Sequence, residues 1–186
     1  CKGERLTFRG RASGPLNRLH AHGTMHTDFG KADLNVTLRN VIDPNRPLEI
    51  GGSASTERLD IGRIMAGIPV GECDMRTGLN ATFAKDSLGI VIDPLYVDGL
   101  DVLGYKYSNI AAVGTFSQDA FDGRIVCSDP NLNFLFQGIF SLSSKTKNAL
   151  YQFYANLGYA DLHALDIDER GVSKMSLSTQ ANFTRI

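Results

Sequence analysis

The chain has 186 residues and a net charge of −1, and apolar residues make up 42% of it, which is enough for a core. Its basic residues are scattered, so it lacks the electrostatic footprint of a nucleic-acid-binding protein and no nucleic acid is expected as a partner. No apolar run approaches the roughly 20 residues that a membrane-spanning helix needs.

The dominant pattern along the chain is alternation of apolar and polar residues with a period of two. It runs through residues 5–13, 31–39, 48–54, 75–83 and 174–183. Successive side chains of a strand point to opposite faces of its sheet, so each run predicts a strand with one dry and one wet face. This pattern is typical of antiparallel sheets, because buried parallel strands read as continuous apolar runs. The sequence therefore predicts an all-β, antiparallel protein.

Polar turn sequences separate these runs. The segments that suit hairpins are 27–30, 85–87, 117–119 and 168–171. Three Asp-Pro pairs are Asp43-Pro44, Asp93-Pro94 and Asp129-Pro130. Proline cannot donate a hydrogen bond to a sheet, so each pair is expected at a turn or at a sheet edge.

Very little helix is expected. Residues 60–66 are predicted to form one or two helical turns, because Asp60 can cap them and Gly67 can end them. Residues 148–158 fit either a helix or a strand, and their aromatic residues favour a strand.

Cysteines and histidines are the first candidates for chemistry. Cys73 and Cys127 lie in strand-like runs and fit two buried thiols or one disulfide, and buried thiols are the ordinary state of such residues. Cys1 could carry a lipid anchor or simply begin the segment. His20 and His22 would share a face, with Cα atoms about 6.6 Å apart, and could bind one metal ion. That face is the polar one, where solvated histidines are the simpler interpretation, so we predict no metal.

Catalytic arrangements are missing from the sequence. It contains no GxSxG elbow and no glycine-rich phosphate loop before a helix. The carboxylates near predicted turns are Asp98, Asp101, Asp119 and Asp122, interpreted as turn or edge residues. Tyr105, Tyr107 and Phe116 could form a platform for sugar, or could pack across strands. We predict neither enzymatic activity nor a cofactor.

The remaining candidate is the apolar face itself. In residues 128–143 the apolar positions share one side of the strand, while Leu135 and Ile139 lie on the other. A filled sandwich core and an open groove for acyl chains both need a dry face, so the periodicity leaves both open. The groove candidates are Leu34, Val36, Leu38, Ile50, Leu79, Phe83, Leu132, Phe134, Phe136, Phe140, Met175, Leu177 and Phe183.

Several segments also suggest a family. Gly23-Thr24-Met25 recurs as Gly114-Thr115-Phe116, and each precedes an Asp-Pro-Asn turn, which indicates repeated hairpins. Asp129-Pro130-Asn131-Leu132 leads into Phe134, Phe136 and Gly138, and residues 59–64 and 159–165 add further matches. These motifs resemble the repeating β region of the TamB-type translocation and assembly module proteins, relatives of AsmA.

The resemblance implies a curled antiparallel sheet, a β-taco or jelly-roll-like trough, with an apolar concave face that holds phospholipid acyl chains. Such proteins work in the periplasm of Gram-negative bacteria, anchored in the inner membrane, in lipid transport and outer-membrane biogenesis. Outer-membrane assembly proteins would meet other parts of the parent chain. Residues 1–186 would then be a single β-repeat segment of a much longer protein, with 1–70 and 71–186 as candidate sub-repeats. The alternative is a closed β-sandwich for adhesion or carbohydrate binding.

Overall fold

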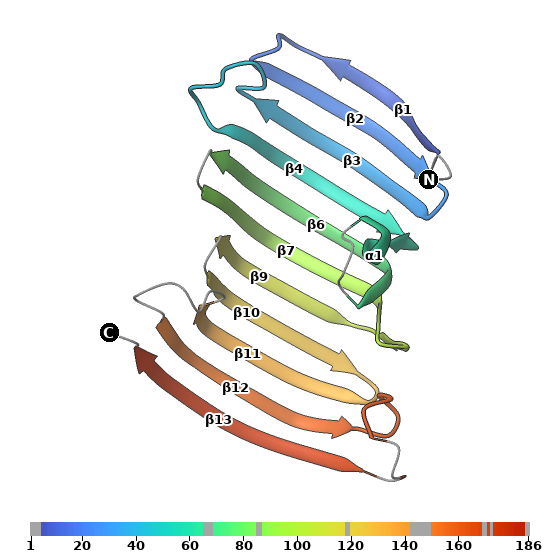
Figure 1. Cartoon of the computed structure of the whole chain (residues 1–186), viewed down its shortest axis with the longest axis vertical. Coiled ribbons are helices and arrows are strands. Elements are labelled where there is room, and N and C mark those ends of the chain that lie inside the picture. The colour runs from blue at the N-terminus through green and yellow to red at the C-terminus, as the bar shows by residue number, and fades with distance from the viewer. Residues whose placement is uncertain are drawn as a thin grey trace.

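The structure, a computed structural model, describes residues 5–64, 69–84, 87–117, 120–141, 150–168, 171 and 173–184. The described chain forms a 13-stranded sheet and one short helix (Figure 1). In chain order the elements are β1 (Leu6–Ser13), β2 (Arg18–Thr27), β3 (Gly30–Arg39), β4 (Leu48–Glu57), β5 (Leu59–Asp60), α1 (Ile61–Ile64), β6 (Val70–Ala84), β7 (Ser87–Val102), β8 (Tyr105–Tyr107), β9 (Ile110–Ser117), β10 (Ala120–Asp129), β11 (Leu132–Ser141), β12 (Leu150–Asp161) and β13 (Lys174–Thr184).

Neighbouring strands of the sheet are also neighbours in the sequence. The order is β1-β2-β3-β4-β6-β7-β9-β10-β11-β12-β13, with β5 paired to β6 and β8 paired to β7. Every strand pair is antiparallel. The prediction of an all-β antiparallel protein with very little helix is confirmed.

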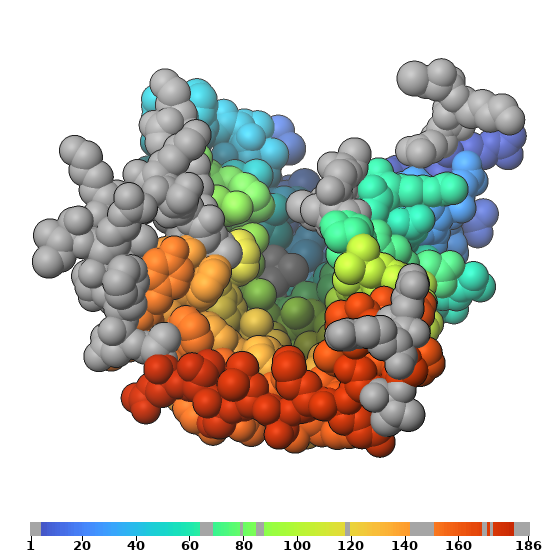
Figure 2. All heavy atoms as spheres, turned by 60° about the horizontal axis from the view of Figure 1, so that its bottom comes forward, coloured from blue at the N-terminus to red at the C-terminus, as the bar shows by residue number. Residues whose placement is uncertain are grey.

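The sheet is curled into a trough. The strands are bowed along their length in Figure 1, and Figure 2 shows atoms rising on both sides of a central hollow, with β13 in front. One rim, here the hairpin rim, carries the turns at 14–17 and 40–47. The other, the helix rim, carries α1, β8 and the turn at 162–168.

The trough is one layer thick. All strands of the described chain belong to the same sheet, with no second sheet packed across it. Its buried apolar residues are mostly small, and no described side chain is below 2% exposed. They are Ala32, Leu59, Cys73, Ala81, Val97, Ala112, Phe121, Cys127, Ala160 and Leu165. The core is therefore thin, unlike the filled interior of a sandwich.

The structure shows a helix at the predicted position and a strand in the segment that fitted either a helix or a strand. Helix α1 begins after Asp60, whose Oδ1 accepts a hydrogen bond from the Arg63 N–H at 3.2 Å, as a capping residue does. Residues 65–68, including the predicted end of the helix, lie outside the described residues. The segment 148–158 falls on β12 and is a strand from Leu150 onward, while 148–149 lie outside the described residues.

The turn predictions are confirmed where they can be followed, with one exception. Thr27 pairs with Gly30 to close the β2–β3 hairpin. The other predicted hairpins include residues 85–86, 118–119 and 169–170, which lie outside the described chain. Asp43-Pro44 lies in the 40–47 turn, and Asp129-Pro130 lies where β10 ends and the turn to β11 begins. For Asp93-Pro94 the prediction of a turn or edge was wrong, because the pair lies inside β7. The register shifts there between Ile92 and Leu95, and a bulge accommodates proline by leaving it out of the ladder.

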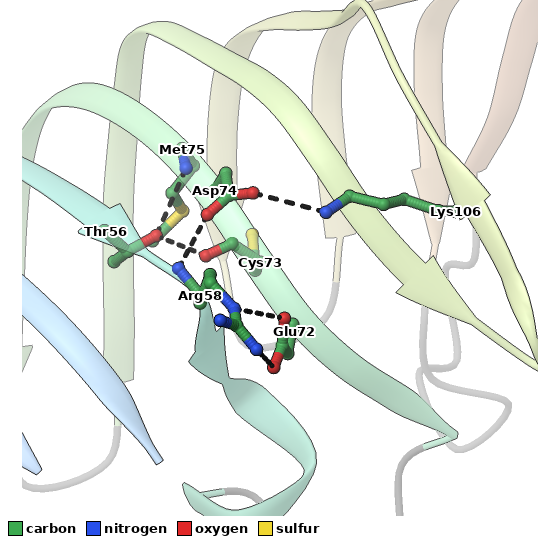
Figure 3. A network of polar contacts seen from close by, with 7 residues as sticks. All are labelled: Thr56, Arg58, Glu72, Cys73, Asp74, Met75 and Lys106. Carbon is green, nitrogen blue, oxygen red and sulfur yellow. Dashed lines mark hydrogen bonds and ion pairs between the residues drawn. The ribbon is translucent and has the colours of Figure 1, made fainter. Parts of the chain in front are cut away.

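A threonine bridges the short gap between the β4–β6 pairing and the β5–β6 pairing (Figure 3). The Thr56 hydroxyl donates to the Cys73 carbonyl at 2.7 Å and accepts a hydrogen bond from the Met75 N–H at 3.1 Å. The side chain thus takes the place of a backbone pair just beyond the regular β4–β6 register, which ends at Ser55.

An ionic network joins the same point to the rest of the helix rim (Figure 3). The Arg58 guanidinium donates to both Glu72 carboxylate oxygens at 3.0 Å, and the Arg58 N–H donates to Asp74 at 2.6 Å. Lys106 of β8 reaches the other oxygen of Asp74 at 3.5 Å. Through its hydrogen bond and charge, Arg58 lowers the pKa of Glu72. The network thus connects the end of β4 with β6 and β8 on the helix rim.

Candidate functional site

The register divides the sheet into two chemically different faces. Directly paired residues of antiparallel strands lie on the same face. Phe121 pairs with Phe116 on β9 and Phe140 on β11, and Phe140 pairs with Tyr151 on β12. Continued through all eleven strands of the main path, this face is almost wholly apolar, and we call it the apolar face.

All of the predicted groove candidates hold register positions on the apolar face. Leu34, Val36 and Leu38 pair with Ala54, Gly52 and Ile50 of β4. Ile50, Leu79 and Phe83 follow on β4 and β6, and Leu132, Phe134, Phe136 and Phe140 on β11. Met175, Leu177 and Phe183 pair with Ala160, Leu157 and Tyr151. Leu135 pairs with Val126 and Asn156 on the opposite, polar face, as predicted.

Strand β7 contributes residues that the sequence pattern did not reveal. Ile90 and Ile92 lie on the apolar face with Phe116 and Gly114, and Leu95 and Val97 lie there with Ala112 and Ile110. The bulge at Asp93-Pro94 shifts the alternation by one residue between these two pairs, so a strict period of two fails here. An Asp-Pro pair between two short alternating runs is the signal that could have found them.

Aromatic rings form a row across β9–β12 on the apolar face. The ring centroids of Phe116 and Phe121 are 6.1 Å apart, and those of Phe121 and Phe136 are 6.0 Å apart. The row continues from Phe136 to Phe153 at 5.3 Å and from Phe153 to Phe140 at 6.3 Å. These spacings suit favourable aromatic pairs. The row gives this part of the face a continuous apolar surface.

The apolar face contains both buried small side chains and exposed large ones. Every buried apolar residue that lies in a strand is on this face. Yet several large residues of the same face remain well exposed, and they include Phe83 (42%), Phe140 (40%), Met175 (44%) and Leu177 (55%). Apolar surface of this kind on a protein commonly marks a binding region.

The polar face carries exposed ion pairs. Lys31 bridges to Asp33 at 3.2 Å and to Glu57 at 3.5 Å, and Arg76 reaches Asp98 at 3.4 Å. Hydrogen bonds from Thr24 and Lys31 lower the pKa of Asp33. Asp98, Asp101 and Asp122 lie within β7 and β10 and not in turns, and Asp119 lies outside the described residues. Asp98 and Asp101 share β7, and Asp122 lies on a different strand, β10.

The predicted histidine pair, His20 and His22, lies among polar cross-strand neighbours on β2. His20 Nδ1 lies 2.9 Å from the Thr37 hydroxyl, and His22 stands between Arg11 and Asn35 in the register. Among the described residues there is no group of three or more histidine, cysteine or acidic side chains that could hold a metal ion.

The three candidate aromatics for sugar binding are separated. Tyr105 and Tyr107 pack edge to face at 4.7 Å on the helix rim. Phe116 lies toward the other end of β9 and packs on Phe121. They form no common platform, and Phe116 packs across strands.

Asp129 is a buried carboxylate at the end of β10, 6% exposed. The Tyr105 hydroxyl donates to it at 2.5 Å, the Ser108 N–H and hydroxyl at 2.9 and 2.8 Å, and the Asn131 N–H at 2.8 Å. Burial alone would raise the pKa of Asp129, but these hydrogen bonds favour the ionised form and lower it. A carboxylate satisfied on both oxygens joins β8 to the β10–β11 turn and is not suited to proton transfer.

Cys73 and Cys127 are free, buried thiols. Burial raises the pKa of both, which makes them poor nucleophiles. Of the two alternatives left open by the sequence, two buried thiols are confirmed and a disulfide was wrong.

The described part of the chain contains no helix that is long and apolar enough to span a membrane. Comparisons with protein-family models, with curated proteins and with solved structures found no match to this chain. The fold itself is that of an open, single-layer antiparallel β-trough.

Proposed function

We propose that the chain is a non-catalytic lipid-carrying segment, in which the apolar face lines the concave side of the trough and shields phospholipid acyl chains. The observation that carries the proposal is the continuous apolar face across the sheet, which is not covered by a second layer in the described chain. Shielding an acyl chain contributes about 0.8 kcal/mol for each methylene removed from water.

Burial supports placing this face on the inside of the curve. Bending a sheet crowds the side chains on its concave side and separates those on its convex side. All buried apolar strand residues are on the apolar face, including small ones such as Ala32, Ala81 and Ala112. On the opposite face, small residues such as Ser53 and Ser128 are exposed.

The dimensions of the sheet also suit a lipid. A strand of ten residues such as β10 spans roughly 33 Å, longer than one extended acyl chain. Such a surface recognises methylenes and needs no fixed polar group, which agrees with the spread-out carboxylates and histidines of this chain. The single layer favours an open groove over the closed sandwich of an adhesion or carbohydrate-binding module.

The cellular setting belongs to the same proposal. With the resemblance to TamB-type proteins, the segment would lie in the periplasm of a Gram-negative bacterium. Its parent protein would be anchored in the inner membrane and would carry phospholipid toward the outer membrane. Contacts with outer-membrane assembly proteins would be made by other parts of that parent.

Site-specific photocrosslinking tests the proposal. A benzophenone amino acid at Phe136 or Leu177 should form phospholipid adducts when the protein is produced in Gram-negative cells, and mass spectrometry identifies the adducts. Leu135 and Ser178 are matched controls, because each is next in sequence to a tested residue but lies on the polar face. Equal labelling from both faces, or no adduct from the apolar face of folded protein, would contradict the proposal.

A further inference from the structure

Two neighbouring turns of the hairpin rim expose large apolar side chains. Leu16 in the first turn is 57% exposed, and Val41 and Ile42 in the second are 45% and 64% exposed. The turns lie side by side, because the Asn40 N–H donates to the Asn17 carbonyl at 3.1 Å. We call Leu16, Val41 and Ile42 the corner patch.

The turns that carry the corner patch are held in place by their own hydrogen bonds. The Arg18 N–H donates to the Pro15 carbonyl at 2.8 Å, which closes the first turn. In the second, the Asn40 side-chain amide donates to the Pro47 carbonyl at 3.0 Å and the Asp43 N–H donates to the Asn40 carbonyl at 3.3 Å. The three apolar side chains are therefore presented by ordered backbone, which lowers the entropy cost of binding.

Three arginines lie in or next to the two turns that carry the corner patch. Arg18 and Arg39 are direct cross-strand partners at the base of the turns, and Arg46 lies in the second turn. Arg39 and Arg46 have acidic neighbours, Glu49 and Asp43, each at 3.5 Å. Arg18 takes part in no ion pair within the described ranges of the chain.

The wider charge distribution points the same way. Residues 1–46 contain eight Lys and Arg against four Asp and Glu, a charge of +4, whereas residues 47–186 contain eleven against sixteen, a charge of −5. The near-zero total of −1 hides this asymmetry. The corner patch lies at the positive end of the sheet.

The helix rim provides an internal comparison. Leu103 and Ile167 are comparably exposed, at 74% and 62%. Their turns are adjacent, since a Cβ built on Gly104 would lie 3.6 Å from Asp166 Oδ2. Acidic residues flank them, namely Asp101, Asp166 and Asp168. The two rims therefore present apolar tips of similar exposure with opposite local charge.

We propose that the corner patch docks on the surface of an anionic phospholipid bilayer. Apolar tips enter the boundary between headgroups and acyl chains, and nearby arginines contact lipid phosphates, as in other interfacial membrane binders. A nucleic acid backbone would use the arginines but not the exposed apolar side chains. An acidic protein could use both, so the test must distinguish an acidic protein partner from an anionic bilayer. The docking site lies on the rim and does not depend on lipid binding along the apolar face.

Vesicle flotation of the whole chain tests this site. Wild-type protein should float with vesicles that contain phosphatidylglycerol and should bind vesicles of phosphatidylcholine alone at least about tenfold more weakly. The triple change Leu16→Ser, Val41→Ser and Ile42→Ser should weaken binding at least about tenfold by removing the inserted side chains. Arg18→Gln should weaken it about fivefold, and salt should weaken binding of the wild type.

The matched control is the double change Leu103→Ser and Ile167→Ser, which removes similar apolar tips from the acidic rim and should leave binding unchanged. Thermal unfolding of each variant verifies that it is folded. Absence of wild-type binding to phosphatidylglycerol vesicles, or equal losses from the two rims, would overturn the proposal, and so would capture of an acidic protein alone. Photocrosslinking of lipid at Phe136 reports on the apolar face separately, because the corner-patch variant should keep it.

Discussion

Asp129 shows how a charged residue is kept at the edge of an otherwise apolar face. Its four hydrogen bonds come from Tyr105, Ser108 and Asn131, so the carboxylate holds three separate backbone positions together. Because these bonds favour the ionised form, the pKa of Asp129 is lower in the folded protein than the ordinary value of 3.8. The stabilisation is thus complete at neutral pH and is lost as the pH falls through the folded-state pKa.

We expect Asp129→Asn to lower the free energy of unfolding by about 1–3 kcal/mol at pH 7, because the neutral amide loses charge-assisted hydrogen bonds and turns a donor toward other donors. The difference from the wild type should shrink as the pH falls below about 4, because the unfolded carboxylate then takes up a proton before the folded one does. Urea unfolding of the wild type and the variant at pH 7 and at pH 3 measures the loss of stability and its dependence on pH. Asp122→Asn, on the exposed polar side of the same strand, should change stability by less than about 0.5 kcal/mol. A pH-independent effect of Asp129→Asn would contradict this account.

At the scale of strands, two hairpins share a construction of paired glycines covered by a phenylalanine. Gly123 of β10 faces Gly114 of β9, and a Cβ built on Gly123 would lie 2.7 Å from the Phe121 ring and 2.3 Å from the Val113 carbonyl oxygen. Gly10 and Gly23 form the same arrangement under Phe8 on β1 and β2. The ring next to the two glycines occupies the space that a side chain at either position would need.

Gly123→Ala should therefore destabilise the protein by about 1–3 kcal/mol, since the added methyl meets backbone atoms that cannot move aside cheaply. Gly89→Ala on β7 is the matched control, because a Cβ built there has nothing within 4 Å, and its effect should be neutral or slightly stabilising. Chemical denaturation of the two variants compares them directly. Equal destabilisation would show that glycine itself, and not the covering ring, sets the requirement.

The same strands show what the sequence could and could not predict. Alternation assigned Leu34, Phe134 and Phe136 to one face because a strand fixes side-chain direction from residue to residue. It failed across Asp93-Pro94, where a bulge shifts the pattern while the strand continues. It also could not show that the sheet stays in one layer, because a sandwich and a trough need the same dry face. The corner patch was missed for another reason: apolar residues in turns break no strand pattern.

At the scale of the whole molecule, the order of the sheet follows the order of the chain. Apart from the short pairings of β5 with β6 and of β8 with β7, each strand pairs only with the strands next to it on the main path, as repeats do in a solenoid. Such an arrangement can open from its ends without disturbing the middle. The edge strand β1 is exposed at every residue, whereas β9 and β10 each contain buried residues and have neighbours on both sides.

Hydrogen exchange should therefore be graded along the sheet. Backbone N–H groups that are paired within β1 and β13 should exchange at least about tenfold faster than those in β9–β11, since fraying an edge strand costs less than opening the centre. Peptide-level exchange measured by mass spectrometry can be restricted to paired N–H groups through the known register. Uniformly slow exchange would contradict this prediction and would mean that the edge strands are protected. Repeating the measurement after dilution would then separate two explanations. Pairing of edge strands between two copies weakens on dilution, whereas cooperative unfolding of the whole sheet does not change.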